Sequence, residues 1–307
     1  MGGDRSERTD PLLLSFRRKV MQRAGGGGVL AAFLVGVVAA GGSADDLAWL
    51  RDRAERLERD LRERILPYWY ARGRDVEGEG WVLDDPPKDT PPDRSLVTQS
   101  RMIWTFARVH RLGFSTAERN YGAAAEAGYR YLMAKFWDSR HGGAVWTVDA
   151  EGRPVNPRKM MYGQAFGIYA LVELSRATGR REPLERAVQW FRLLRERAYD
   201  RQHGGWIEHF EPDWRPLPLR APEGVPEVAG LKSANTHLHL MEAFTELFAE
   251  TRDPDVRAAL EESLRINREI FYPIQPGRSC FHRHPDWSAV DDPRSTGLSY
   301  GHNVEFG

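Results

Sequence analysis

Residues Leu231–Glu246 have the sequence LKSANTHLHLMEAFTE, and their pattern is the clearest guide to the structure of the chain. In a helix, successive residues are rotated by about 100°, so four polar residues of this stretch fall in one narrow stripe: Asn235, His239, Glu242 and Glu246. The opposite side is apolar. A surface helix scatters Lys, Arg and Glu over its polar face, whereas this stripe concentrates an amide, an imidazole and two carboxylates. The pattern predicts a helix that packs by its apolar face and turns its polar stripe into a cavity.

The two histidines of this helix differ in their expected surroundings. His237 lies in the middle of the apolar face, beside Leu240 and Phe244, so we interpret it as a packed, hydrogen-bonded core residue. His239 lies on the polar stripe and is the candidate for chemistry.

Composition limits the classes of function. The chain has 307 residues, 41% of them hydrophobic, which is enough to bury a large core. Lys+Arg and Asp+Glu both number 44, so no charge excess points to nucleic acid or to an anionic surface. Cys280 is the only cysteine, which excludes an intrachain disulfide and argues against a thiolate metal site.

Residues 1–44 resemble a targeting segment. Four basic residues (Arg17, Arg18, Lys19 and Arg23) precede the apolar run Val29–Ala40, and Gly42-Ser43-Ala44 offers a cleavage site. The run is shorter than the roughly 20 residues that span a bilayer. We therefore expect export to the periplasm or the outside, without stable membrane insertion once the signal is removed. An uncleaved membrane tether is the alternative.

Residues 45–307 form the expected folded domain. Apolar spacing predicts helices, and no convincing long β-strand, in the rest of the chain. Besides the helix described above, the ranges are Asp45–Ile65 (ending near Pro67), Val97–Leu112, Arg119–Phe136, Met160–Ala177, Glu182–Ala198 and Asp255–Ile270.

A loop motif repeats between these helices. The sequence DSRHGG, beginning at Asp138, returns as DRQHGG from Asp200, 62 residues later, and Gly80-Trp81 is interpreted as a degenerate first copy. Two helices separate the copies, which is typical of a repeat architecture. We expect helical hairpins that close into an all-α (α/α)6 toroid, with inner helices lining a pocket. Glycines that supply positive φ explain the His-Gly-Gly loops better than a metal site does.

The last residues supply a second His/Glu pair. His302 and Glu305 share a helix face at i, i+3, as His239 and Glu242 do. A neighbouring carboxylate fixes the tautomer of an imidazole and raises its basicity, so two such pairs favour proton transfer. We expect Arg101 to be buried near them.

Six segments resemble the N-acylglucosamine 2-epimerase and cellobiose 2-epimerase family, most closely its cellobiose branch. The segments are SRMIWTFARVHRLG, DSRHGGAVWTVDAEGRP, RKMMYGQAFGIYAL, HGGWIE, NTHLHLMEAFTELF and SYGHNVE. The resemblance implies an (α/α)6 barrel that inverts C2 at the reducing end of a sugar by deprotonation and reprotonation. It implies a mono- or disaccharide substrate, with no metal, nucleotide or other cofactor in the chemical step.

The resemblance also implies roles for individual residues. Arg101 would hold the carbonyl or enediolate oxygen, where a cation stabilises developing charge. His302 would be one acid/base residue at C2, oriented by Glu305, and His239 would assist ring opening. Four residues would contact the substrate: Tyr162, Trp104, Asn235 and Glu242.

The family pattern continues beyond this sequence. Its second acid/base histidine lies near the end of the chain, in helices that follow the segment matching Ser299–Glu305. Six hairpins at the observed period need about 372 residues, whereas residues 45–307 provide 263, or about four hairpins. We therefore expect a truncated sequence.

Three alternatives stay open. An aldose–ketose isomerase would use the same enediolate. A glycoside hydrolase on a similar toroid would need two carboxylates facing each other across the sugar, and the inner stripes offer His with Glu instead. A non-catalytic sugar- or protein-binding barrel is the third alternative if the sequence truly ends at Gly307. Oligomeric state does not follow from the sequence.

Overall fold

The computed structural model describes residues 44–71, 80–82, 93–218, 229–273, 280–292, 295 and 300–306. The targeting segment expected over residues 1–44 lies outside this part of the chain, except for Ala44, which begins the first helix of the described ranges. Within the described ranges, no helix is long and apolar enough to cross a membrane.

Helices dominate the structure, and the strands are short. The helices are α3 (Ala44–Asp60), α4 (Leu66–Ala71), α5 (Leu96–Arg111), α6 (Tyr121–Tyr131), α7 (Met161–Thr178), α8 (Glu182–Arg197), α9 (Ala234–Thr251), α10 (Pro254–Ile266) and α11 (Tyr300–Phe306). Five-residue π turns extend three of them, over Leu61–Ile65, Leu132–Phe136 and Asn267–Phe271. The strands are β1 (Arg94–Ser95), β2 (Thr147–Val148), β3 (Pro154–Asn156), β4 (Lys159–Met160), β5 (His209–Phe210), β6 (Lys232–Ser233) and β7 (His282–Arg283).

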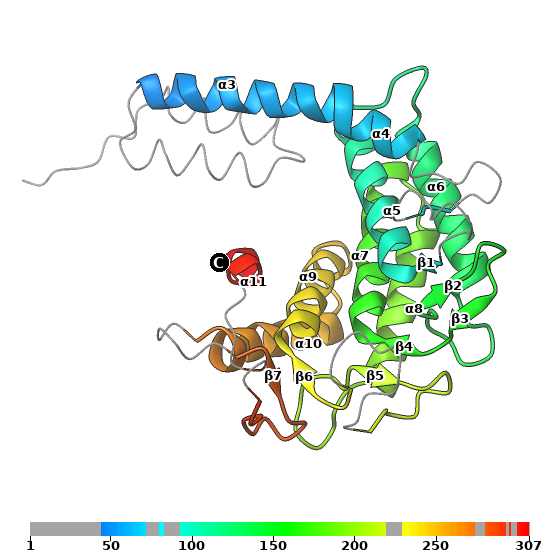
Figure 1. Cartoon of the computed structure of the whole chain (residues 1–307), viewed down its shortest axis with the longest axis vertical. Helices are drawn as coiled ribbons and strands as arrows, with labels where there is room; N and C mark the ends of the chain where they lie inside the picture. Colours follow the sequence, from blue (N-terminus) through cyan, green and yellow to red (C-terminus); the bar gives the residue numbers. More distant parts are fainter. Residues whose placement is uncertain are drawn as a thin grey trace, which may run out of the picture.

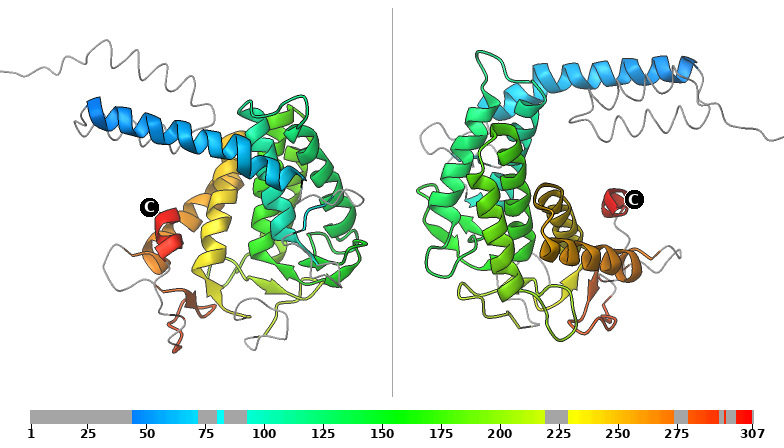
Figure 2. Two further views of the ribbon diagram at one scale, coloured as in Figure 1. Left: turned by 45° about the horizontal axis from the view of Figure 1, so that its top comes forward. Right: turned by 180° about the vertical axis from the view of Figure 1, so that it is seen from behind.

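The helices form hairpins arranged along an arc. Helices α5, α7 and α9 pack side by side as an inner layer, while α6, α8 and α10 pack behind them (Figures 1 and 2). Helix α11 lies beside α9 and begins the next inner position. The described part of the chain thus contains three hairpins and the first helix of a fourth, as expected for an (α/α)6 toroid. Its strands pair only as two- and three-stranded antiparallel sheets in the loops.

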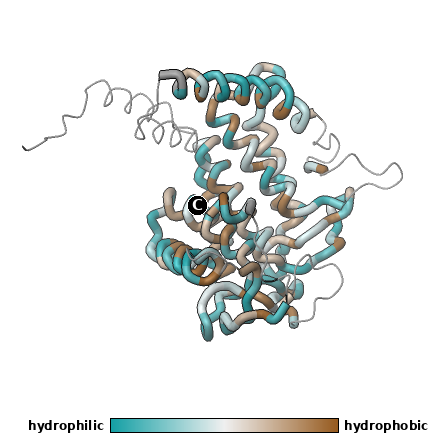
Figure 3. The backbone as a smooth tube through the Cα atoms, turned by 60° about the vertical axis from the view of Figure 1, so that its left-hand side comes forward, coloured by the Kyte–Doolittle hydropathy of each residue, from teal (hydrophilic) through white to brown (hydrophobic). Residues whose placement is uncertain are grey.

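Helix α3 stands apart from the hairpins. It extends away from them (Figure 1), and Figure 3 shows it as mostly hydrophilic, whereas apolar residues recur along the packed helices. Two residues of its predicted apolar stripe, Leu57 and Ile65 of the following π turn, are 65% and 49% exposed.

Two predicted helix boundaries were wrong. The helical path does not end near Pro67 but continues through α4, because the preceding π turn shifts the hydrogen bonding and places Pro67 in the first turn of a new segment. There the missing N–H costs little. The central helix begins at Ala234 rather than Leu231, because Lys232 and Ser233 pair with β7 and Ser233 caps the helix by accepting a hydrogen bond from Thr236 N.

The apolar core lies between the inner and outer layers. Helix α7 is buried nearly all round, as its sequence predicts for an inner helix. Gly167 allows its close approach to α8, since a Cβ there would lie 2.2 Å from the Trp190 ring. His237 is fully buried, and its Nδ1 donates to Ser233 O at 2.9 Å. The prediction of a hydrogen-bonded core histidine is therefore confirmed.

The repeated loops are tight turns tied to the inner helices. Asp138 accepts from the backbone N–H groups of Arg140 and His141, and Asp200 accepts in the same way from Gln202 and His203. Gly142, Gly143, Gly204 and Gly205 all have φ between 71° and 75°. These values confirm that the glycines serve turn formation.

A buried lysine holds each loop carboxylate. Lys159 Nζ lies 2.8 Å from Asp138 Oδ2, and Lys232 Nζ lies 2.7 Å from Asp200 Oδ2. Burial lowers the pKa of both lysines, and the aspartate beside each opposes this shift. Lys232 also donates to the carbonyl oxygens of Gly204 and Pro285, so it joins two loops at the start of α9.

We expect Lys232→Met to destabilise the fold by roughly 3 kcal/mol, because it leaves the Asp200 carboxylate without its cation at a site that is 7% exposed. Urea denaturation followed by circular dichroism measures the change. Lys135→Met, at an exposed lysine, is the matched control and should change the unfolding free energy by less than about 0.5 kcal/mol. Equal effects of the two substitutions would contradict a special role for Lys232.

Candidate active site

The hairpin repeat brings equivalent residues of the inner helices to one cavity. The sixth residues of α5, α7, α9 and α11 are Arg101, Phe166, His239 and Glu305. Because these helices begin at corresponding places after the loops, their sixth residues lie at a similar depth. They line one side of a cavity of about 220 Å³. Four further residues complete its wall: Trp104, Thr105, Tyr169 and Glu242.

His239 is held firmly at this cavity. Its Nδ1 donates to Glu242 Oε2 at 2.7 Å, and its ring packs against Phe166, with ring centroids 4.7 Å apart. The Tyr162 ring lies 5.2 Å away on another side. The hydrogen bond to Glu242 fixes the orientation of the imidazole and leaves Nε2 as the nitrogen that can act on a substrate. The predicted His239/Glu242 pair is therefore present.

A residue of α9, Asn235, holds the side chain of His302 in place. Its Nε2 is hydrogen-bonded to Asn235 Oδ1 at 2.9 Å, and its ring centroid lies 6.3 Å from that of His239. Since a carbonyl oxygen only accepts, the imidazole carries its hydrogen on Nε2 in this arrangement. Asn235, which was expected to contact substrate, is not among the residues lining the cavity and instead positions His302.

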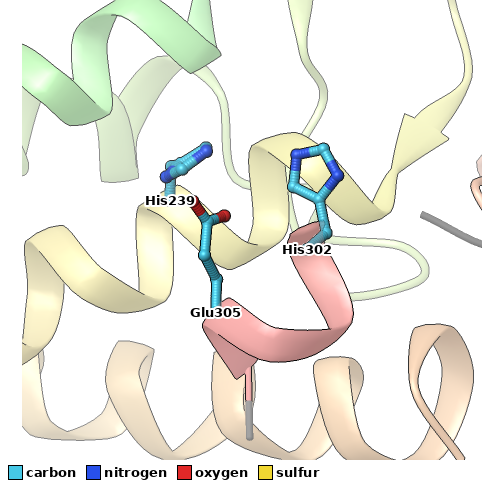
Figure 4. Close-up of side chains that lie close together, drawn as sticks. All are labelled: His239, His302 and Glu305. Atoms are coloured by element: carbon cyan, nitrogen blue, oxygen red, sulfur yellow. The ribbon is translucent and has the colours of Figure 1, made fainter. Parts of the chain in front are cut away.

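Glu305 lies against both histidines. The three side chains point into the same space between α9 and α11 (Figure 4). One nitrogen of each histidine and one Glu305 carboxylate oxygen all lie within 4.8 Å of one another. The sequence predicted that Glu305 orients His302, and the structure adds that its carboxylate also faces His239.

The expectation that Arg101 is buried was wrong. Its side chain is exposed, and its guanidinium carbon lies 4.3 Å from the centre of the Phe166 ring. A cation over an aromatic face is held without an ion pair and keeps its donors available. Arg101 therefore lines the cavity as a positive group that a substrate oxygen can reach.

Two aromatic residues form another part of the wall. Trp104 and Tyr169 stack at 5.0 Å with an interplanar angle of 12°. Burial raises the pKa of Tyr169, and the charges of Glu242 and Glu246 raise it further, so its hydroxyl stays protonated. Trp104 Nε1 is buried without a hydrogen-bond partner among the described residues. Trp104 is thus at the cavity as predicted, whereas Tyr162 packs beside His239 and does not line it.

Glu246 departs from the predicted polar stripe. Its carboxylate pairs with Arg176 of α7 and so joins two inner helices instead of entering the cavity. The sequence reasoning also did not assign a site role to Thr105, Phe166 or Tyr169. Counting from the start of each inner helix would have identified Phe166, because it occupies the same sixth position as Arg101 and His239.

The chain is similar to sugar epimerases and isomerases. The cellobiose 2-epimerase of Bacteroides fragilis is 28% identical over 255 residues, which cover 82% of this chain and 63% of that protein. The D-mannose isomerase of Thermobifida fusca is 27% identical, with 84% and 62% covered. The solved structure of cellobiose 2-epimerase from Spirochaeta thermophila superimposes with a TM-score of 0.71 and 34% identity, covering 83% of this chain and 62% of that one.

These comparisons agree on the family and on a shared part of the chain. The chain spans a little over 60% of the length of these relatives. The family model for N-acylglucosamine 2-epimerase (GlcNAc 2-epimerase) matches residues 78–307, which include every residue of the cavity. The chain belongs to the N-acylglucosamine 2-epimerase family.

Proposed function

We propose that the protein is a carbohydrate 2-epimerase that acts on glucose- and mannose-type reducing ends, with cellobiose as the first substrate to test. The observation that carries this proposal is a pair of imidazoles whose ring centroids lie 6.3 Å apart. His239 lines the cavity, His302 lies next to it, and each is fixed by its own partner. Positioned bases next to a cation are what proton abstraction beside a carbonyl requires. The similarity to cellobiose 2-epimerases supports the same chemistry.

Each group has a defined task in this proposal. His302 removes the proton from C2 of the open-chain sugar, through the nitrogen that does not face Asn235. Arg101 binds the oxygen on which negative charge develops, and so stabilises the enediolate. His239, with Glu242 behind it, moves a proton at the ring oxygen or O1 during ring opening. The Trp104 N–H is placed to donate to a sugar hydroxyl.

Proton exchange and inversion make different demands on the protein. Exchange at C2 needs one base, because the enediolate can be reprotonated from the face it left. Inversion also needs a donor on the opposite face, which the family resemblance places beyond the matched segments. Exchange at C2 is therefore the sharper test of the residues described here.

We expect the protein to exchange the C2 hydrogen of cellobiose with D2O, and His302→Gln to slow this exchange by roughly 100-fold or more, because it removes the base. Proton NMR of the sugar measures the rate. His203→Gln, at an exposed histidine outside the cavity, is the control and should leave the rate unchanged. Wild-type protein that binds cellobiose without any exchange would favour the non-catalytic barrel.

Arg101→Met should lower the exchange rate by roughly 100-fold, because the enediolate loses its cation. Arg101→Lys keeps the charge but not the planar fork, so we expect an intermediate rate. Rates measured at saturating cellobiose separate this effect from weaker binding. If Met and Lys at this position gave the wild-type rate, Arg101 would have no part in charge stabilisation.

The product distinguishes epimerisation from aldose–ketose isomerisation. Aldose–ketose isomerisation is the second candidate activity, because the chain is also similar to a D-mannose isomerase and both reactions share the enediolate. We expect the mannose-type C2 epimer of cellobiose rather than the ketose in chromatographic product analysis. A ketose as the main product, with C2 exchange intact, would assign the protein to the isomerase branch.

A further inference from the structure

The geometry points to a divalent cation site of the zinc class at His239, His302 and Glu305. Their ligand-type atoms lie within 4.8 Å of one another, and the three side chains converge from α9 and α11 (Figure 4). Among the described residues they are the only such group of three His, Cys, Asp or Glu side chains. Two imidazoles and one carboxylate match the preferred donors of Zn²⁺, and three protein ligands leave a fourth position open.

The outer contacts of both histidines suit metal binding. A ligating histidine usually donates its other ring N–H to a carboxylate or carbonyl oxygen, which fixes the ring and raises its basicity. His239 donates Nδ1–H to Glu242, so its Nε2 would be the ligand. His302 is held through Nε2 by Asn235, so with this contact kept its Nδ1 would be the ligand, and the ring must turn to bring Nδ1 towards His239 (Figure 4). Both outer partners come from α9, the helix that also carries His239.

Closing the site needs a turn of the His302 ring and an approach of the ligand atoms. Zinc bonds of 2.0–2.2 Å at tetrahedral angles place ligand atoms about 3.4 Å apart. The present separations lie within 4.8 Å, so the ligands must approach by up to about 1.4 Å. Glu305 can supply this movement because it is exposed on a short helix, whereas His239 is 5% exposed and packed against Phe166.

Metal and sugar would compete for the same groups. A cation on His239 and His302 occupies the lone pairs that proton transfer uses, and it fills part of the cavity between Arg101 and Glu305. The inference goes beyond the proposed sugar chemistry, since it concerns binding and does not require turnover. If the protein has both the metal site and the proposed sugar chemistry, Zn²⁺ acts as an inhibitor that competes with the sugar.

Direct binding tests the site without an activity assay. Isothermal titration calorimetry of the chelator-treated protein with Zn²⁺ should show one equivalent bound, and Co²⁺ should give the visible absorption of a four- or five-coordinate site. His302→Gln and Glu305→Gln should each weaken Zn²⁺ binding by roughly 100-fold, and Asn235→Ala by roughly 10-fold. His203→Gln removes a histidine beside Asp200, outside the cavity, and should leave this binding unchanged.

The outcomes separate the metal site from the proposed function. Glu305→Gln is the decisive variant, since an exposed, isosteric change preserves the fold, which circular dichroism checks. If it binds Zn²⁺ as tightly as the wild type, or if the wild type binds none, the inference is overturned. One-equivalent binding that depends on His302 and Glu305 supports the site even in a protein without C2 exchange, and that result would contradict only the epimerase proposal.

Discussion

In α5, α7 and α9 the side chain of the fourth residue holds the backbone of the loop before the helix, and the register of these three helices depends on this contact. Gln99 Oε1 accepts from Trp81 N at 2.8 Å, and Gln164 Oε1 accepts from Ala144 N at 3.0 Å. In α9 the same task falls to His237, whose Nε2 accepts from Trp206 N at 3.2 Å. Buried backbone groups need partners, so each helix is fixed in rotation and in height relative to its loop.

The site is a consequence of that register. With the fourth residue turned towards the loop, the sixth residue of each helix faces the cavity, and the arc collects an arginine, a phenylalanine, a histidine and a glutamate at one level. Charged residues further along the inner helices pair with one another. Glu173, which is 1% exposed, forms ion pairs with Arg108, Arg111 and Arg176. The polar groups of the inner layer therefore divide into those that join helices and those that face a ligand.

The helical fold could be predicted from the sequence because it depends on local features. These are the spacing of apolar residues along each helix and the repeated His-Gly-Gly turns between helices. The degenerate copy at Gly80-Trp81 was recognisable for the same reason, and the Gln99 contact with Trp81 confirms it. The central histidines could be separated by helix face alone. Three features could not be predicted in this way: the exposure of Arg101, the ion pair of Glu246 and the contact of Asn235 with His302. They depend on side chains of neighbouring helices, which the spacing of residues within one helix does not specify.

We propose that residues from four inner helices form one sugar site. A crystal structure with cellobiitol, an open-chain analogue that lacks the carbonyl and cannot react, tests it most directly. We expect the alditol end in the cavity, with C2 beside His302, the C1 or C5 oxygen towards His239 and an adjacent hydroxyl within hydrogen-bond distance of Arg101. An alditol end bound away from these three side chains would contradict it.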